Sequence, residues 1–203
     1  RDSFYSTPNG NRTFFSFFRE ENPKTTGFKE VSMDEVRYVL KDNGYSPSYA
    51  DTEEFQTNLQ PSQPCNRFVT SFFEISRMMY LLQYGFFYVD TIDEKTGQPV
   101  TQKHIMRYPQ FFASKAILKR IDSGGKSGII FHTQGSGKTE LSAFSTRILR
   151  DYYSAKGITA KFYYVVDRLD LLLQVRDEMR NRGLNVIEVN SREAFEEELT
   201  RPL

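Results

Sequence analysis

The chain has 203 residues, with 27 Lys and Arg against 26 Asp and Glu. This balance gives no sign of a generally basic, nucleic-acid-binding surface. The apolar share of 38% and the aromatic share of 15% are enough for a core and exclude a disordered chain. One cysteine, Cys65, excludes an internal disulfide and favours a reducing compartment.

No apolar run approaches the length of about 20 residues that a membrane helix needs. The start, RDSFYSTPNG, contains no signal peptide and no initiator methionine. We therefore expect a cytoplasmic protein without a membrane partner, and a chain excised from a longer one.

Residues 1–65 are predicted to form a mixed α+β segment. A turn at Pro8–Gly10 precedes an aromatic strand. Ser32 and Glu35 have the spacing of a capping box, which predicts a short helix that ends near Gly44. The polar stretch 45–65 contains three prolines and is typical of a linker.

Residues 66–103 are predicted to form a connecting helix and a hairpin. The strand of the hairpin is YGFFYVD, residues 84–90, and the turn DEKTGQP follows it. The helix is predicted from apolar residues at spacings of four, three, four and three, which indicate one buried stripe. These residues are Phe68, Phe72, Ile75, Met79 and Leu82.

From residue 104 the chain alternates predicted strands and helices. A helix begins near Pro109, and apolar runs at 127–132, 160–166 and 185–189 are each followed by a helical pattern. Short joints between such elements favour parallel βαβ units. We therefore predict an α/β domain over residues 104–203, a parallel sheet with flanking helices.

The joint between the strand 127–132 and the next helix has the sequence HTQGSGKT. Glycines allow a tight loop whose N–H groups converge on phosphate, and the helix start adds its positive dipole end. Lys138 would contact the β- and γ-phosphates of a nucleotide, and the Thr139 hydroxyl would bind Mg²⁺. The predicted nucleotide-binding residues of this loop are Gln134, Gly135, Ser136, Gly137, Lys138 and Thr139. The first glycine of the general pattern is replaced by His132, which we interpret as a shaping residue. The alternative is a glycine-rich turn with an incidental Lys-Thr pair.

Three blocks together resemble one family. HTQGSGKT resembles motif I of superfamily 2 helicases and translocases, in particular the motor of the restriction (R) subunit of type I restriction-modification enzymes. YYVVDRLDLLLQ resembles motif Ia of that family, and MRYPQFFASKAI resembles its adenine-reading segment. The resemblance covers about residues 104–190 and implies a RecA-like fold.

The resemblance also implies roles for three further residues. Gln110 would read adenine, because its amide can pair with the N6 and N7 edge of the base. The alternative is a surface glutamine at a helix start. Tyr108 would either stack on the base or pack under the helix. Arg168 would contact a DNA phosphate or, alternatively, be a buried partner of Asp167 or Asp170. Asp170 is expected to cap the next helix.

For the whole protein, the resemblance implies an ATP-dependent DNA translocase and endonuclease that acts in host defence. Its cofactors would be ATP and Mg²⁺, and its partners double-stranded DNA with methyltransferase and specificity subunits. Residues 1–65 would then be the trailing part of a nuclease domain. Two alternatives are a superfamily 2 translocase without a nuclease and an unrelated P-loop protein.

We expect no catalytic residue within this chain, so that the fragment alone would be inactive. Asp93-Glu94-Lys95 matches a nuclease triplet by letters but falls in a predicted turn. Asp177-Glu178 lies inside a helical pattern and does not qualify as the carboxylate pair that orients the attacking water. Two histidines and one cysteine do not form a zinc site.

Overall fold

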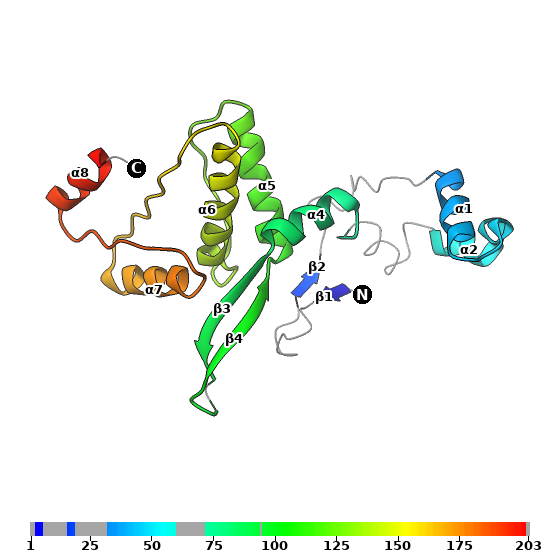
Figure 1. The fold of residues 1–203 in the computed structure, drawn as a ribbon, viewed down its shortest axis with the longest axis horizontal. Coiled ribbons are helices and arrows are strands. Elements are labelled where there is room, and N and C mark those ends of the chain that lie inside the picture. Colours follow the sequence, from blue (N-terminus) through cyan, green and yellow to red (C-terminus); the bar gives the residue numbers. More distant parts are fainter. Residues whose placement is uncertain (1–2, 6–15, 19–31, 60–71, 94, 202–203) are drawn as a thin grey trace. The chain divides into compact units, whose positions relative to one another are not determined.

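A computed structural model describes residues 3–5, 16–18, 32–59, 72–93 and 95–201. The chain divides into two compact units, and all of the first lies before residue 83. The second contains residues 83–203, so the whole phosphate-loop sequence lies in it. Figure 1 follows both units along the chain by colour.

The best-defined element of the first unit is helix α1, Met33–Asp42. Its predicted capping box is confirmed: the Ser32 hydroxyl accepts the Glu35 N–H (3.2 Å), and the Glu35 carboxylate accepts the Ser32 N–H (3.1 Å). These bonds satisfy backbone donors that the helix start leaves unpaired. The chain then turns at Gly44, whose φ of +80° suits glycine.

The rest of the first unit consists of short elements. Strands β1 (Ser3–Tyr5) and β2 (Ser16–Phe18) pair in antiparallel fashion. A 3-10 helix η2 (Pro47–Asp51) and helix α2 (Glu53–Leu59) occupy part of the predicted linker. The predicted turn at residues 8–10 and Cys65 lie outside the described residues.

Helix α4, Ile75–Tyr84, corrects the predicted apolar stripe. Ile75, Met79 and Leu82 are exposed, whereas Leu81 is buried. The run MMYLL places apolar side chains on more than one face of the helix, so spacing alone selects the wrong face. Phe72 is buried as predicted, and Phe68 lies outside the described residues.

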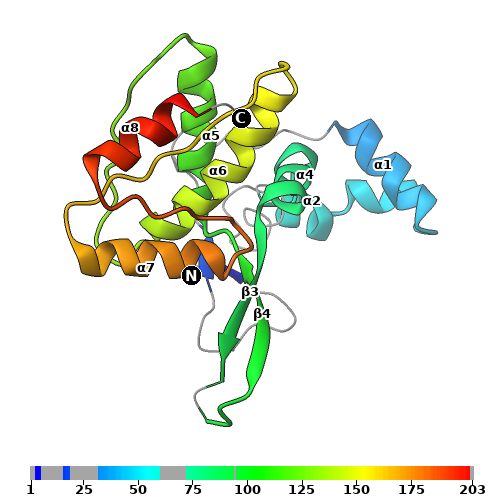
Figure 2. The same cartoon turned by 60° about the vertical axis from the view of Figure 1, so that its left-hand side comes forward.

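The second unit begins with the predicted hairpin, formed by β3 (Phe86–Ile92) and β4 (Pro99–Ile105). The strands pair in antiparallel register, with Phe86 opposite Ile105, and Figures 1 and 2 show them as a two-stranded arm. On β3, Phe87 and Val89 are buried. The arm therefore has one face that packs on the helices.

Four helices follow: α5 (Tyr108–Asp122), α6 (Lys138–Ser154), α7 (Leu169–Arg180) and α8 (Arg192–Thr200). Helices α5 and α6 lie side by side in both views, and α6 also contacts α7.

The core of the second unit forms around α6. The spacing of Leu141, Phe144, Ile148 and Tyr152 predicts one apolar face, and the first three are buried on it, whereas Tyr152 is only half-buried. The Phe144 ring lies 4.7 Å from the Phe87 ring, centroid to centroid. Such aromatic pairs add to the free energy of burial, so this contact fixes the helix on the hairpin.

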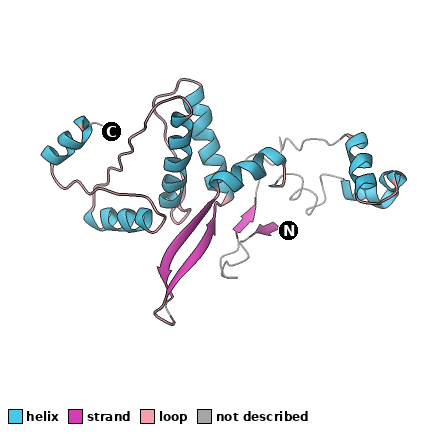
Figure 3. Cartoon of the chain, viewed as in Figure 1, coloured by secondary structure: helices cyan, strands magenta, loops and turns pink. Residues whose placement is uncertain are grey.

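The structure does not show the predicted parallel sheet. The structure has a mixed α/β composition, but within residues 95–201 the runs 127–132, 160–166 and 185–189 are extended loops (Figure 3). A parallel strand depends on hydrogen bonds to neighbours and on burial of both faces. Ile129 and Phe131 are 96% and 92% exposed, so neither condition is met.

At the start of α8, the hydroxyl of Ser191 accepts the Ala194 N–H at 3.1 Å and so caps the helix. None of the helices in the described residues is long and apolar enough to cross a membrane.

Candidate nucleotide-binding site

The predicted phosphate loop is a sharp turn that leads into α6. Gly135 and Gly137 have φ angles of +73° and +80°, a left-handed conformation that glycine adopts at little cost. Gly137 is the N-cap of α6, which begins at Lys138. The first N–H groups of α6 and the positive end of its dipole therefore face the loop, and this arrangement attracts anions.

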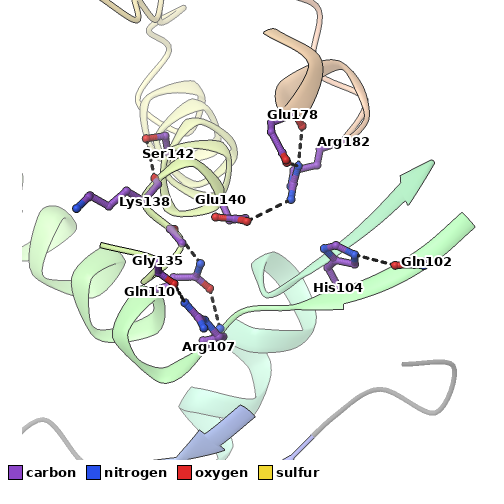
Figure 4. A network of polar contacts seen from close by, with 11 residues as sticks. Gln102, His104, Arg107, Gln110, Gly135, Lys138, Glu140, Ser142, Glu178 and Arg182 are labelled. Atoms are coloured by element: carbon purple, nitrogen blue, oxygen red, sulfur yellow. Dashed lines mark hydrogen bonds and ion pairs between the residues drawn. The ribbon is translucent and has the colours of Figure 1, made fainter. Parts of the chain in front are cut away.

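The ammonium of Lys138 lies over the start of the loop. Its Nζ donates to the carbonyl oxygen of His132 (2.7 Å) and to that of Thr133 (3.3 Å). The Ser142 hydroxyl donates to the Lys138 carbonyl one turn further along α6 (Figure 4). One positive charge is therefore held at the loop.

Two enclosed polar atoms of the loop have no hydrogen-bond partner among the described residues: the Ser136 hydroxyl oxygen and His132 Nδ1. Enclosed polar groups normally have partners, and each missing one costs free energy. Phosphate oxygens can accept from a hydroxyl. The residues of the loop therefore fit a nucleotide phosphate, and Thr139 stands next to them in the first turn of α6.

Gln110 lies against the phosphate loop. Its Nε2 donates to the Gly137 carbonyl (3.0 Å), and its Oε1 accepts the Arg107 N–H (2.8 Å). The residue is only 3% exposed, so the alternative of a surface glutamine is wrong. Its role at adenine stays a prediction. Tyr108, one of the predicted base contacts, is half-buried at the start of α5.

Arg107 is a loop contact that the sequence did not reveal. Its Nη2 donates to the Gly135 carbonyl at 3.1 Å across a separation of 28 residues (Figure 4). The sequence offers one indication of this contact: Arg107 is a cation directly before the helix that carries Gln110. Together the two side chains bind the carbonyls of both loop glycines, so Arg107 and the first turn of α5 hold the loop in place.

The contact with Gln110 also explains why position 137 is a glycine. A Cβ there would lie 2.4 Å from Gln110 Nε2 and 3.0 Å from a Glu140 carboxylate oxygen. A side chain there would displace the Gln110 amide from the loop, in addition to the cost of the left-handed backbone.

The predicted DNA contact, Arg168, is exposed and lies at the N-cap of α7. Its guanidinium binds Asp170 through two hydrogen bonds, one of 3.1 Å. Asp170 therefore lies in the first turn as an ion-pair partner, and the prediction that it caps α7 is wrong. The buried alternative for Arg168 is wrong as well, since both side chains are more than half exposed.

The Asp93-Glu94-Lys95 triplet does not resemble a catalytic site at the residues that the structure describes. The Asp93 carboxylate accepts the N–H groups of Lys95 (2.9 Å) and Thr96 (2.8 Å). The hydrogen bond from the Thr96 N–H, then that from Lys95, lowers the pKa of Asp93. Asp93 thus shapes the hairpin turn. Across the described ranges, no three His, Cys, Asp or Glu side chains gather as a metal site.

Sequence comparisons with known proteins find relatives for part of the chain. The sequence pattern of the SWI2/SNF2 ATPases matches residues 109–202. A putative type I restriction enzyme MjaVIIP endonuclease subunit from Methanocaldococcus jannaschii is 36% identical over 107 residues, which cover 50% of this chain and 10% of the relative. The resemblance to type I restriction endonuclease subunits is confirmed.

Further relatives are type I restriction enzyme endonuclease subunits of Staphylococcus aureus. SauCOLORF180P, from strain COL, is 36% identical over 73 residues, or 36% of this chain and 7% of the relative. SauMSSORF170P, from strain MSSA476, matches to the same extent. The match to these restriction endonuclease subunits thus spans a tenth of their length or less. No solved structure matches the chain at a significant level.

A Gln110→Ala change tests how Gln110 acts. It removes two hydrogen bonds and leaves the Gly137 carbonyl without its side-chain donor, so we expect a stability loss of about 1–3 kcal/mol. The affinities for ATP and for GTP should both fall about tenfold, because the change disturbs the loop and removes no contact with the base. Equilibrium binding of both nucleotides measures this.

Gln98→Ala, at an exposed position in the hairpin turn, is the matched control and should change neither affinity. A loss confined to ATP would instead mean that Gln110 reads the base.

Proposed function

We propose that this chain binds ATP and Mg²⁺ as part of the motor of a type I restriction endonuclease subunit. The observation that carries the proposal is the left-handed pair Gly135 and Gly137 directly before Lys138 at the start of α6. An anion-attracting helix start, a fixed cation and enclosed unpaired polar atoms meet at this one loop.

In this proposal the N–H groups of Gln134–Gly137 and the Lys138 ammonium hold the phosphates, and the Thr139 hydroxyl holds Mg²⁺. Arg107 and Gln110 hold the loop, and Tyr108 lies on the side of the adenine. Hydrolysis of the bound ATP would supply the free energy for translocation. The carboxylates that orient the attacking water are proposed to lie outside the described residues.

The larger organisation is part of the same proposal. Residues 104–203 would form the first part of a RecA-like motor domain, in which runs 127–132, 160–166 and 185–189 pair as parallel strands. Residues 66–103 would connect it to a nuclease-type domain that ends within 1–65. The cytoplasmic whole would translocate on double-stranded DNA and cleave it together with methyltransferase and specificity subunits, with Arg168 on the DNA.

The proposal is tested with the full-length protein that carries this chain, assembled with its methyltransferase and specificity subunits. ATP turnover is measured with and without unmethylated duplex DNA, and cleavage of the DNA is followed on a gel. We expect DNA to raise turnover several-fold, and cleavage to require hydrolysable ATP.

Turnover without any cleavage would favour a superfamily 2 translocase that lacks a nuclease. Turnover that does not respond to DNA would favour an unrelated P-loop protein. The absence of both nucleotide binding and turnover would contradict the proposal.

A further inference from the structure

Beyond the predicted site, the second unit contains a buried arginine that none of the motifs includes. The Arg182 side chain is only 3% exposed, in the turn that follows α7. Arginine keeps its charge in proteins, and a buried charge is costly unless it is paired. The partners of Arg182 therefore indicate what the residue does.

Arg182 has two carboxylate partners. Its Nη1 donates to the Glu178 carbonyl at 2.8 Å and binds the Glu178 carboxylate. Its Nη2 lies 3.8 Å from an oxygen of Glu140 (Figure 4). Glu178 belongs to α7, whereas Glu140 belongs to the first turn of α6, directly after Lys138 and Thr139.

Glu140 places a carboxylate in the first turn of α6, beside the predicted phosphate site. A carboxylate in the first turn of a helix occupies the positive potential that would otherwise attract an anionic ligand. Its Oε2 also turns back toward the loop, 3.0 Å from where a Cβ of Gly137 would stand. A phosphate bound in the loop would therefore approach a second negative charge, and like charges repel each other more strongly in a partly buried site than in water.

The turn that carries Arg182 is itself fixed. The Asp90 N–H on β3 donates to the Asn181 carbonyl at 3.2 Å, and the Arg182 N–H donates to the Met179 carbonyl at 3.1 Å. Because the backbone is held on both sides, the guanidinium is presented to Glu140 in a defined position. His104, on β4, is the nearby titratable group; its burial, then Arg182, lowers its pKa and favours its neutral form.

We propose that Arg182 is a positioning residue for nucleotide binding: it neutralises and holds Glu140, so that a triphosphate can approach the loop at Gly135–Thr139. This role rests on the proposed function, and it explains how an acidic residue is tolerated beside a phosphate site. Arg182 itself touches no nucleotide.

The test measures the dissociation constant of MgATP for the full-length protein and five variants, at low and at high salt. For Arg182→Gln we expect about tenfold weaker binding, because the Glu140 charge is exposed to the phosphates. For Glu140→Gln we expect equal or tighter binding. The double variant should bind within about threefold of the original protein, because it restores the charge sum of the site.

A purely structural link between α6 and α7 gives a different pattern. Glu140→Gln would break the same link and weaken binding, and the double variant would be no better than Arg182→Gln. Either result would overturn the proposal. Arg182→Lys, which keeps the charge, should recover most of the affinity. If Arg182→Gln does not fold, the sign of the Glu140→Gln effect decides alone.

A Lys138→Ala variant distinguishes a failure of this proposal from a failure of the proposed function. If the original protein does not bind MgATP, or if Lys138→Ala does not weaken its binding, the proposed function fails. If Lys138→Ala abolishes binding and Arg182→Gln leaves the dissociation constant unchanged, only the role of Arg182 fails.

Discussion

Replacement of Lys138 by alanine is expected to weaken MgATP binding by about 100-fold, or about 2.7 kcal/mol, and to abolish ATP-dependent action on DNA. Lys138 is the cation that the structure places on the loop carbonyls of His132 and Thr133. Charge-assisted hydrogen bonds to phosphate are about twice as strong as neutral ones, and alanine offers no substitute.

The same change should hardly affect folding. Lys138 is exposed, so the midpoint of thermal unfolding should move little, since exposed substitutions typically change stability by less than about 0.5 kcal/mol. Calorimetric titration with MgATP measures the affinity, and thermal unfolding measures the stability.

Lys156→Ala is the matched control. It removes a lysine of similar exposure, just beyond the far end of α6, where the ammonium lies over the Tyr152 ring. Its MgATP affinity should equal that of the original protein. A Lys138→Ala variant that retains full affinity would mean that the loop does not bind phosphate.

A Gly137→Ala change is expected to impair both the fold and the site. The left-handed backbone at φ +80° costs an alanine about 1–2 kcal/mol. The new Cβ would also stand 2.4 Å from Gln110 Nε2, so that this side chain has to leave the loop. We expect thermal unfolding to shift down by about 5–10 °C and MgATP affinity to fall by at least about 30-fold.

Gly157→Ala separates the two causes. Gly157 has a φ of +70°, and a Cβ there would meet nothing within 4 Å. This variant should lose only the stability that the left-handed backbone costs an alanine, and its affinity for MgATP should be unchanged. If Gly137→Ala behaves in the same way as Gly157→Ala, the crowding by Gln110 is irrelevant to the site.

What the sequence predicted well is local. The capping box at Ser32 and Glu35 and the buried face of α6 depend on residues a few positions apart, and both are present. The sharp turn before α6 is local too, because Gly135, Gly137 and Lys138 are almost adjacent, whereas its binding of phosphate stays a prediction. Short-range rules of backbone geometry are sufficient for such features.

What the sequence did not predict depends on partners elsewhere in the chain. The run 127–132 has the composition of a strand, but a strand exists only where a neighbour accepts its hydrogen bonds. The contacts from Arg107 to Gly135 and from Arg182 to Glu140 join distant positions, and no spacing rule identifies them. In MMYLL, the periodicity was ambiguous between two faces.

The attachment of the hairpin to α6 has a mechanical consequence. Arg147 Nη1 donates to the Phe86 carbonyl at 3.1 Å, beside the packed rings of Phe87 and Phe144. The helix that starts at the phosphate loop and the base of the β3–β4 arm are therefore joined by both polar and apolar contacts. The arm cannot turn relative to α6 unless the Arg147 hydrogen bond and the contact of the two rings are both broken.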